Sequence, residues 1–170
     1  IQKNKYDSIF STQNLKNVMF ISSVGGHLTQ LLELKKIFKN YNYVLVTENT
    51  DVTRDMKDKY NIRYLPYGSR NQKFKYPFVL LWSCVKSFYY FVKYNPDVIV
   101  TTGANTAAAM CCFGKLFGKK VIYIESFAKR TSPTVTGKCI YKLHAYTTFV
   151  VQWESMLEFY PNAEYWGWIY

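Results

Sequence analysis

The sequence predicts an α/β fold with a Rossmann-like parallel sheet, and three observations support it. Short apolar runs alternate along the chain with segments of helical periodicity. Two of these runs end in glycine-containing turns, as strands that lead into helices commonly do. Apolar residues make up 49% of the 170 residues, which suffices for a core and excludes an intrinsically disordered chain.

The first half of the chain is expected to contain three strands, each rich in β-branched or aromatic residues. They lie at residues 18–22, 43–47 and 62–65. A helix follows Gly26, because apolar residues recur there at a 3.6-residue period as far as Phe38. A second, charged helix is expected at residues 51–59, and Pro66 ends the third strand.

The second half begins with a long apolar segment at residues 77–94, which Pro96 and Asp97 end. Strands are then expected at residues 98–101, 121–124 and 148–151, and helices at residues 106–117 and near residues 137–144. We expect residues 18–170 to form one domain and residues 1–17 to be a polar N-terminal extension. That extension contains no signal peptide or spanning helix, and an anchor before Ile1 stays an open alternative.

The composition points to contacts outside the chain. Lys and Arg total 22 against 11 Asp and Glu, a net charge of +11 that attracts nucleic acid, anionic lipid or phosphorylated substrates. The alternative for scattered lysines is an ordinary solvated surface. With 16 Tyr, 12 Phe and 4 Trp, a domain of this size should leave some rings for a membrane or a partner protein.

The cysteines do not indicate a metal site or a disulfide. Cys84, Cys111, Cys112 and Cys139 form no CxxC pair, and adjacent residues on a helix point in different directions. We therefore expect buried free thiols in a reducing compartment, with no metal and no bound cofactor.

The turn at residues 22–27 joins the first strand to the first helix. Gly25 and Gly26 allow the backbone to approach a ligand, and the helix N-terminus favours a phosphate or diphosphate. The pattern is not GxGxxG, so no dinucleotide is specifically indicated, and a plain turn is the alternative. His27 is a candidate general base for a sugar hydroxyl, with phosphate orientation and helix capping as alternatives.

Two further loops are expected at the same edge of the sheet. Thr102 and Gly103 follow one strand, and Glu125 and Ser126 follow another. Ligands of parallel sheets bind at the carboxyl ends of strands, so these loops should converge with the glycine turn. Glu125 is a candidate catalytic or sugar-binding carboxylate, or else a structural cap. Lys129 and Arg130 are candidate diphosphate ligands, or else solvated charges.

The segment at residues 77–94 has the composition of a helix lying in a membrane interface. Its polar residues Ser83, Lys86, Ser87, Tyr90 and Lys93 fall on one stripe, and the rest of its surface is apolar. Lys86 argues against a spanning helix, and a buried crossover helix is the alternative. The residues expected at the membrane are Lys73, Lys75, Phe78, Leu81, Trp82, Val85, Phe88 and Tyr89.

An ordered set of motifs resembles one family over roughly residues 18–170. They are the runs at residues 96–103 and 118–128, the pair Gly137-Lys138, the run at residues 150–153 and the pair Tyr160-Pro161. The family is the anchor subunit of the two-component N-acetylglucosaminyltransferase of lipid-linked oligosaccharide synthesis, and we place this chain in its bacterial capsule and exopolysaccharide branch. A more distant resemblance is to the N-terminal half of the peptidoglycan lipid II N-acetylglucosaminyltransferase.

The resemblance implies one half of a split GT-B glycosyltransferase. This half would bind a polyprenyl-diphosphate-sugar acceptor, while a partner subunit binds the UDP-sugar donor, so the chain alone should be inactive. By motif, His27 and Glu125 are the catalytic candidates. The candidates for acceptor and diphosphate binding are Gly25, Gly26, Thr102, Gly103, Ser126 and Arg130, and those for the partner interface are Trp166, Trp168, Ile169 and Tyr170.

The implied location is peripheral, on the cytoplasmic face of a membrane, or on the endoplasmic reticulum membrane if the chain is eukaryotic. Two features depart from the family. The spanning helix of the eukaryotic anchor subunit is absent from residues 1–17, and Val24 replaces a smaller residue in the glycine turn. The alternatives are a non-catalytic scaffold that activates its partner and a basic nucleic-acid binder, although no nucleic-acid motif occurs.

Overall fold

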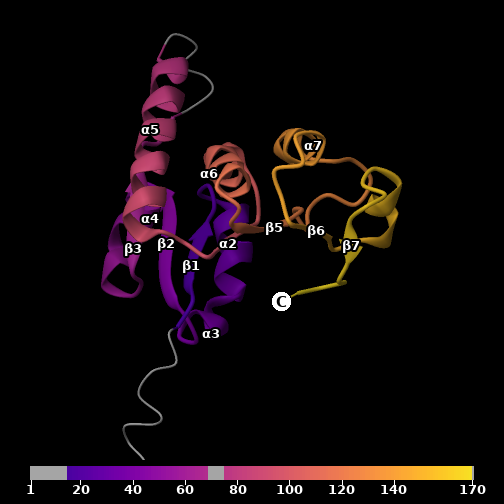
Figure 1. The fold of residues 1–170 in the computed structure, drawn as a ribbon, viewed down its shortest axis with the longest axis horizontal. Coiled ribbons are helices and arrows are strands. Elements are labelled where there is room, and N and C mark those ends of the chain that lie inside the picture. Colours follow the sequence, from indigo (N-terminus) through magenta and orange to yellow (C-terminus); the bar gives the residue numbers. More distant parts are fainter. Residues whose placement is uncertain (1–14, 69–74, 170) are drawn as a thin grey trace, which may run out of the picture.

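The computed structural model describes residues 15–68 and 75–169. Within these residues, seven strands form one sheet in the order β3-β2-β1-β4-β5-β6-β7, with every neighbouring pair parallel (Figure 1). The first six follow the order of the doubly wound Rossmann sheet. The predicted fold class is confirmed.

The strands lie where the apolar runs predict them. They are β1 (Asn17–Ile21), β2 (Asn42–Glu48), β3 (Ile62–Leu65), β4 (Val98–Thr101), β5 (Lys120–Ile124), β6 (Thr148–Val151) and β7 (Glu164–Tyr165). Strand β7 was not predicted, because two exposed residues carry no apolar alternation. Asn17, expected in the N-terminal extension, belongs to β1, while residues 1–14 of that extension lie outside the described residues.

The helices differ from the prediction at their ends. They are α2 (Gly26–Glu33), α3 (Lys35–Phe38), α4 (Asp51–Arg54), α5 (Tyr76–Tyr94), α6 (Asn105–Leu116) and α7 (Val135–Lys142), with the 3₁₀ turns η1 (Asp55–Asp58) and η2 (Glu154–Glu158). The expected first helix is divided at Leu34, whose N–H donates to Leu31 in a tight turn. The charged helix expected at residues 51–59 is likewise divided into α4 and η1, and α7 begins before Gly137, which therefore lies inside a helix.

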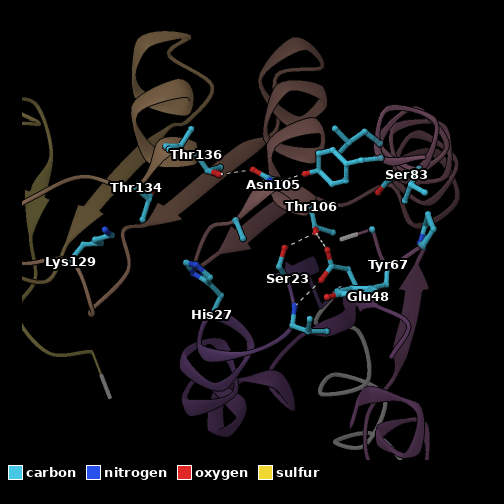
Figure 2. A pocket seen from close by; sticks show the side chains of 18 of the residues that line it. Ser23, His27, Glu48, Tyr67, Ser83, Asn105, Thr106, Lys129, Thr134 and Thr136 are labelled. Atoms are coloured by element: carbon cyan, nitrogen blue, oxygen red, sulfur yellow. Dashed lines mark hydrogen bonds between the residues drawn. The ribbon is translucent and has the colours of Figure 1, made fainter. Parts of the chain in front are cut away.

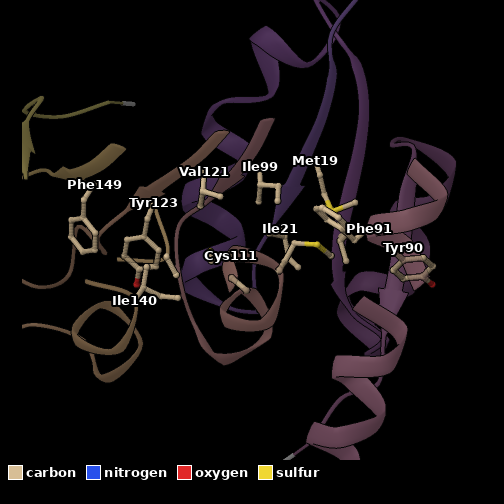
Figure 3. Packing of buried hydrophobic residues seen from close by; sticks show 14 of the residues in the cluster. Met19, Ile21, Tyr90, Phe91, Ile99, Cys111, Val121, Tyr123, Ile140 and Phe149 are labelled. Atoms are coloured by element: carbon tan, nitrogen blue, oxygen red, sulfur yellow. The ribbon is translucent and has the colours of Figure 1, made fainter. Parts of the chain in front are cut away.

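Helices cover both faces of the sheet, and alternate strand residues face them. Met19 and Ile21 of β1 pack in the cluster that includes residues of α5, α6 and α7 (Figure 3). Val18 and Phe20 point the other way, into the cluster with α2 and α3. Because every neighbouring pair of strands is parallel, the carboxyl ends of all the strands lie along one edge of the sheet.

The chain reverses its direction across the sheet between β1 and β4. From β1 the strands proceed to β2 and β3 on one side, whereas β4 begins the series that proceeds to β7 on the other. A crevice outside the carboxyl ends of strands forms at such a switch point and is the usual ligand site of these sheets. The loops after β1 and β4 therefore mark where a site is expected.

The middle of the polar stripe of α5 faces the rest of the protein, whereas Lys93 at its end is exposed. Ser87 and Tyr90 are buried, and the Tyr90 hydroxyl donates to the Tyr64 carbonyl oxygen at 3.1 Å. The apolar residues expected at the membrane form the exposed face, and they are Phe78, Leu81, Trp82, Val85, Phe88 and Tyr89. Lys75 is also exposed, and Lys73 lies outside the described residues. In the part of the chain that the structure describes, no helix is long and apolar enough to cross a bilayer.

Candidate functional site

A cavity of about 500 Å³ opens at the carboxyl ends of the strands around the switch point (Figure 2). Its lining comes from the end of β2, from the loops after β1, β3 and β4, from the first turns of α2, α5, α6 and α7, and from the loop before α7. The main polar residues are Ser23, His27, Glu48, Tyr67, Ser83, Asn105, Thr106, Lys129, Thr134 and Thr136. Hydroxyl groups dominate this set, and a cavity of this size accommodates a sugar with part of its substituent.

His27 is held in the cavity by the loop after β4. Its Nδ1 lies 2.8 Å from the carbonyl oxygen of Thr102, and the Thr102 hydroxyl donates to the His27 carbonyl oxygen at 2.7 Å. A carbonyl oxygen can only accept, so Nδ1 carries the proton and Nε2 carries the lone pair in the neutral ring. The ring is therefore oriented as a base that uses Nε2.

Glu48 forms the floor of the cavity with the hydroxyls of two loops. Its Oε1 accepts from the Thr106 hydroxyl at 2.7 Å, and its Oε2 accepts from the Val24 N–H at 3.1 Å. The Ser23 hydroxyl lies 2.5 Å from that of Thr106. Since Thr106 uses its proton on Glu48, Ser23 is the donor in this contact. One carboxylate thus ties β2 to the turn after β1 and to the start of α6.

Asn105 joins the three helices that bound the cavity. Its Nδ2 donates to the Tyr76 hydroxyl of α5 at 2.9 Å, and its Oδ1 accepts from the Thr136 hydroxyl of α7 at 3.3 Å. The preceding Ala104 has φ 74° and ψ 167°, a backbone region occupied almost only by glycine. The start of α6 is therefore held in a strained conformation where it lines the cavity.

Glu125 is buried beside the cavity instead of lining it. Its oxygens accept from the Ser126 N–H at 2.8 Å, the Thr134 hydroxyl at 2.9 Å and the Tyr160 hydroxyl at 2.7 Å. Burial, and then the Glu125 carboxylate, raise the pKa of the Tyr160 hydroxyl, which stays protonated and donates. This placement favours the structural alternative for Glu125 over the predicted catalytic one.

Most of the other predicted ligand residues also lie outside the lining of the cavity. Gly25 and Gly26 are exposed, and a Cβ added at either would meet no other atom within 4 Å. Thr102 is buried and positions His27. Gly103 has φ 100°, and a Cβ there would lie 2.8 Å from the Tyr123 hydroxyl. Ser126 is buried as well. Of the catalytic and acceptor-binding residues predicted from the sequence, the structure thus brings His27 and Lys129 into the lining of the cavity, as far as its described residues go.

Arg130 borders a second hollow of about 510 Å³, next to Lys129. Its guanidinium carbon lies 4.4 Å from the centre of the Trp153 ring, and its carbonyl oxygen accepts a hydrogen bond from Ser155. Arg130 is thus outside the lining of the main cavity, whereas Lys129 borders both hollows.

The C-terminal segment packs partly on its own chain. The Trp168 ring lies 5.2 Å from that of Phe127 and 6.2 Å from that of Trp153, yet Trp168 is 69% exposed. Trp166 is 49% exposed, consistent with the predicted interface. Ile169 is different, because it packs against the core cluster on the α2 side of the sheet. Tyr170 lies outside the described residues.

Sequence reasoning missed several residues of the site, above all Glu48, Asn105 and Thr106. Glu48 could have been proposed from its position at the carboxyl end of a strand, because Glu125 was proposed for the same reason. In residues 15–68 and 75–169, no group of three or more His, Cys, Asp or Glu could hold a metal ion. Cys84 and Cys139 are exposed, contrary to the expectation of buried thiols, whereas Cys111 is buried.

Comparison with known proteins indicates one family. The family described as "Oligosaccharide biosynthesis protein Alg14 like" matches residues 18–169. The human protein named UDP-N-acetylglucosamine transferase subunit ALG14 is 28% identical over 179 residues, which cover 89% of this chain and 82% of the human protein. Its Schizosaccharomyces pombe namesake is 35% identical over 100 residues, which cover 54% and 46%. Neither name mentions capsule or exopolysaccharide, so the predicted bacterial branch gains no support.

Solved structures with a similar fold are larger than this chain. MurG from Acinetobacter baumannii superposes with a TM-score of 0.67 at 18% identity, over 82% of this chain and 42% of MurG. UDP-N-acetylglucosamine 2-epimerase from Rickettsia bellii gives 0.61 at 11% identity, over 85% and 41%. At these identities the likeness concerns the fold alone, and the chain spans about two-fifths of each structure.

Proposed function

The chain belongs to the Alg14-like family of oligosaccharide biosynthesis proteins, and we propose that it is the acceptor-binding subunit of a two-subunit glycosyltransferase. In this proposal it binds a polyprenyl-diphosphate-linked sugar at a membrane surface, and a separate subunit brings the UDP-sugar donor. The observation that carries the proposal is the family match over residues 18–169, nearly the whole chain. The relative from Homo sapiens is named as a subunit of a UDP-N-acetylglucosamine transferase, which supports that donor class.

The architecture resembles one part of a larger glycosyltransferase fold. One Rossmann-like sheet accounts for the described residues, and the chain spans 42% of the MurG structure that it resembles. We assign the donor-binding half to another chain, because the human relative is named as a subunit of a transferase. The exposed Trp166 and Trp168 are the surface that we assign to that partner.

The chemistry that we propose for the cavity is an attack by an acceptor hydroxyl on the anomeric carbon of the donor sugar. His27 takes the hydroxyl proton through Nε2 as the new glycosidic bond forms and the bond to the nucleotide diphosphate breaks. The contact between Nδ1 and Thr102 supports this role, since it fixes the tautomer and the orientation of the ring. The proposal requires no bound cofactor on this chain.

Reconstitution tests the proposal. We expect the purified chain to lack transfer from a UDP-sugar to a polyprenyl-diphosphate-sugar, and the chain together with its donor-binding subunit to show it. Turnover by the chain alone would contradict the two-subunit proposal. A purely scaffolding role is the second candidate, because Glu125, one of the two predicted catalytic residues, is buried outside the cavity.

We further propose peripheral binding to the cytoplasmic side of a membrane, and the exposed apolar face of α5 supports the contact with lipid. This α5 face consists of Phe78, Leu81, Trp82, Val85, Phe88 and Tyr89, and Lys75 precedes it. Other apolar residues of the same helix line the cavity, among them Val79 and Leu80. A lipid-linked acceptor could thus reach the cavity from the membrane along this helix.

A double substitution on the α5 face should weaken membrane binding. We expect Leu81→Gln with Trp82→Gln to lower the partition onto anionic vesicles about tenfold or more, because each side chain contributes roughly 1.5–3 kcal/mol when buried. Vesicle flotation measures the effect. Val52→Gln is the matched control, since Val52 is 86% exposed on α4, away from this face. Equal flotation of the double variant and the unmodified chain would show that α5 does not contact the membrane.

A further inference from the structure

We propose that Glu48 binds hydroxyl groups of the acceptor sugar, which makes the floor of the cavity a sugar subsite. This inference rests on the proposed function, because it assigns one part of the acceptor to one part of the same cavity. Glu48 did not enter the sequence-based site, and nothing in the family match assigns it a role.

The Glu48 carboxylate retains capacity for a ligand. Two carboxylate oxygens offer about four acceptor positions. The structure fills one on Oε1 with the Thr106 hydroxyl and one on Oε2 with the Val24 N–H. These two bonds fix the carboxylate at the floor of the cavity, with Glu48 half-buried and lining it. A positioned acceptor of this kind suits donors such as a pair of sugar hydroxyls.

The charges near Glu48 favour a neutral ligand over a phosphate. Among the described residues that line the cavity, Lys129 is the one with a permanent positive charge. Figure 2 places it on the opposite side of the cavity from Glu48, beyond His27. A phosphate placed against Glu48 would face a like charge with no lysine or arginine of the described lining beside it. The sugar of a lipid-diphosphate-sugar can bind there without this repulsion.

An aromatic residue lines the same cavity as this carboxylate. Strands β2 and β3 pair with Glu48 opposite Leu65, which brings Pro66 and Tyr67 to the cavity beside Glu48. Tyr67 is 53% exposed, so its ring offers an apolar surface to the C–H face of a sugar. A carboxylate for the hydroxyls and a ring for the apolar face are the two elements that a sugar site needs.

Binding measurements with and without the sugar test the proposal. The probes are farnesyl diphosphate and its derivatives that carry N-acetylglucosamine or glucose, measured by calorimetry below their micellar concentrations. We expect the unmodified chain to bind a sugar-bearing probe more tightly than farnesyl diphosphate. Glu48→Gln should weaken binding of that probe about ten- to a hundredfold, as expected for hydrogen bonds to a charged group, and leave farnesyl diphosphate unaffected.

Two further variants make the test specific. Glu33→Gln removes the same charge from an exposed position of α2 outside the cavity, and it should bind all probes like the unmodified chain. Tyr67→Ala should also reduce the preference for the sugar-bearing probe. It replaces Glu48→Gln as the test if a thermal melt shows that Glu48→Gln does not fold. Its exposed ring makes little contribution to the core.

The outcomes separate this inference from the proposed function. If the unmodified chain binds no probe, the proposed acceptor class itself is wrong. If it binds farnesyl diphosphate without any preference for a sugar, or if Glu48→Gln weakens all probes equally or none, the sugar subsite is wrong while the proposed acceptor class stands. Equal weakening would mean that Glu48 only holds the loops together.

Discussion

Replacing Gly137 with alanine is expected to destabilise the protein by about 3 kcal/mol, although alanine is the better helix former. Gly137 lies inside α7 against the buried Glu125 cluster. A Cβ there would overlap with Glu125 Oε2, and it would lie 2.6 Å from the Tyr160 hydroxyl and 2.8 Å from the Thr134 hydroxyl. The added methyl group therefore has to displace buried hydrogen-bonding partners, which costs more than the helix propensity gains.

Urea unfolding with a helical glycine as control measures this effect. Gly26→Ala is the control, because Gly26 is also in a helix and a Cβ there meets nothing within 4 Å. We expect its free energy of unfolding to stay within about 0.5 kcal/mol of the unmodified value. Equal stability of the two variants would mean that the contacts around Glu125 are not as tight as the structure has them.

Replacing His27 with asparagine is expected to lower the turnover of the reconstituted two-subunit enzyme about a hundredfold or more. Asparagine can still donate to the Thr102 carbonyl oxygen from its amide nitrogen, which takes the place of Nδ1. It provides nothing in the place of Nε2. The variant should therefore assemble normally, bind the acceptor normally and lose the chemical step, which a lower kcat at an unchanged KM would report.

The second histidine provides the control for this variant. The Nδ1 of His144 lies 2.9 Å from the Tyr141 carbonyl oxygen, so it makes the same kind of contact outside the cavity. Its φ of 52° is one that asparagine tolerates, which makes His144→Asn a matched substitution. Unchanged kcat in His27→Asn would favour the scaffolding alternative for this chain.

Much of the fold could be predicted because a buried parallel strand has a strong local signal. The β-branched runs around Val100 and Val150 admit few other interpretations, and each ends at a turn. The breaks in the helices at Leu34 and within residues 51–59 were not predictable, because hydrophobic periodicity does not show where an α-helical turn gives way to a tighter 3₁₀ turn. The inward stripe of α5 was not predictable either, since burying Ser87 depends on how closely the helix approaches the sheet.

The site was harder to predict than the fold, because a residue belongs to the site only if its side chain points into the cavity, and its place along the chain does not decide this. Glu48 and Glu125 both stand where a strand ends, yet one lines the cavity and the other is buried. Successive side chains of a strand point to opposite faces, and the exact end of each strand decides which way the carboxylate turns. His27 was predicted because it follows the glycine turn after a buried strand, and that turn lies at the switch point of the sheet.

The distribution of the tryptophans allows intrinsic fluorescence to report on two different surfaces of the molecule. Of the four tryptophans in the chain, Trp82 lies on the exposed face of α5, whereas Trp153, Trp166 and Trp168 belong to the C-terminal part. Emission from Trp82 should shift to shorter wavelength when lipid covers it, and emission from the other three should respond when a second subunit covers them. With Trp82→Phe in hand, fluorescence can follow the two associations separately and without a label.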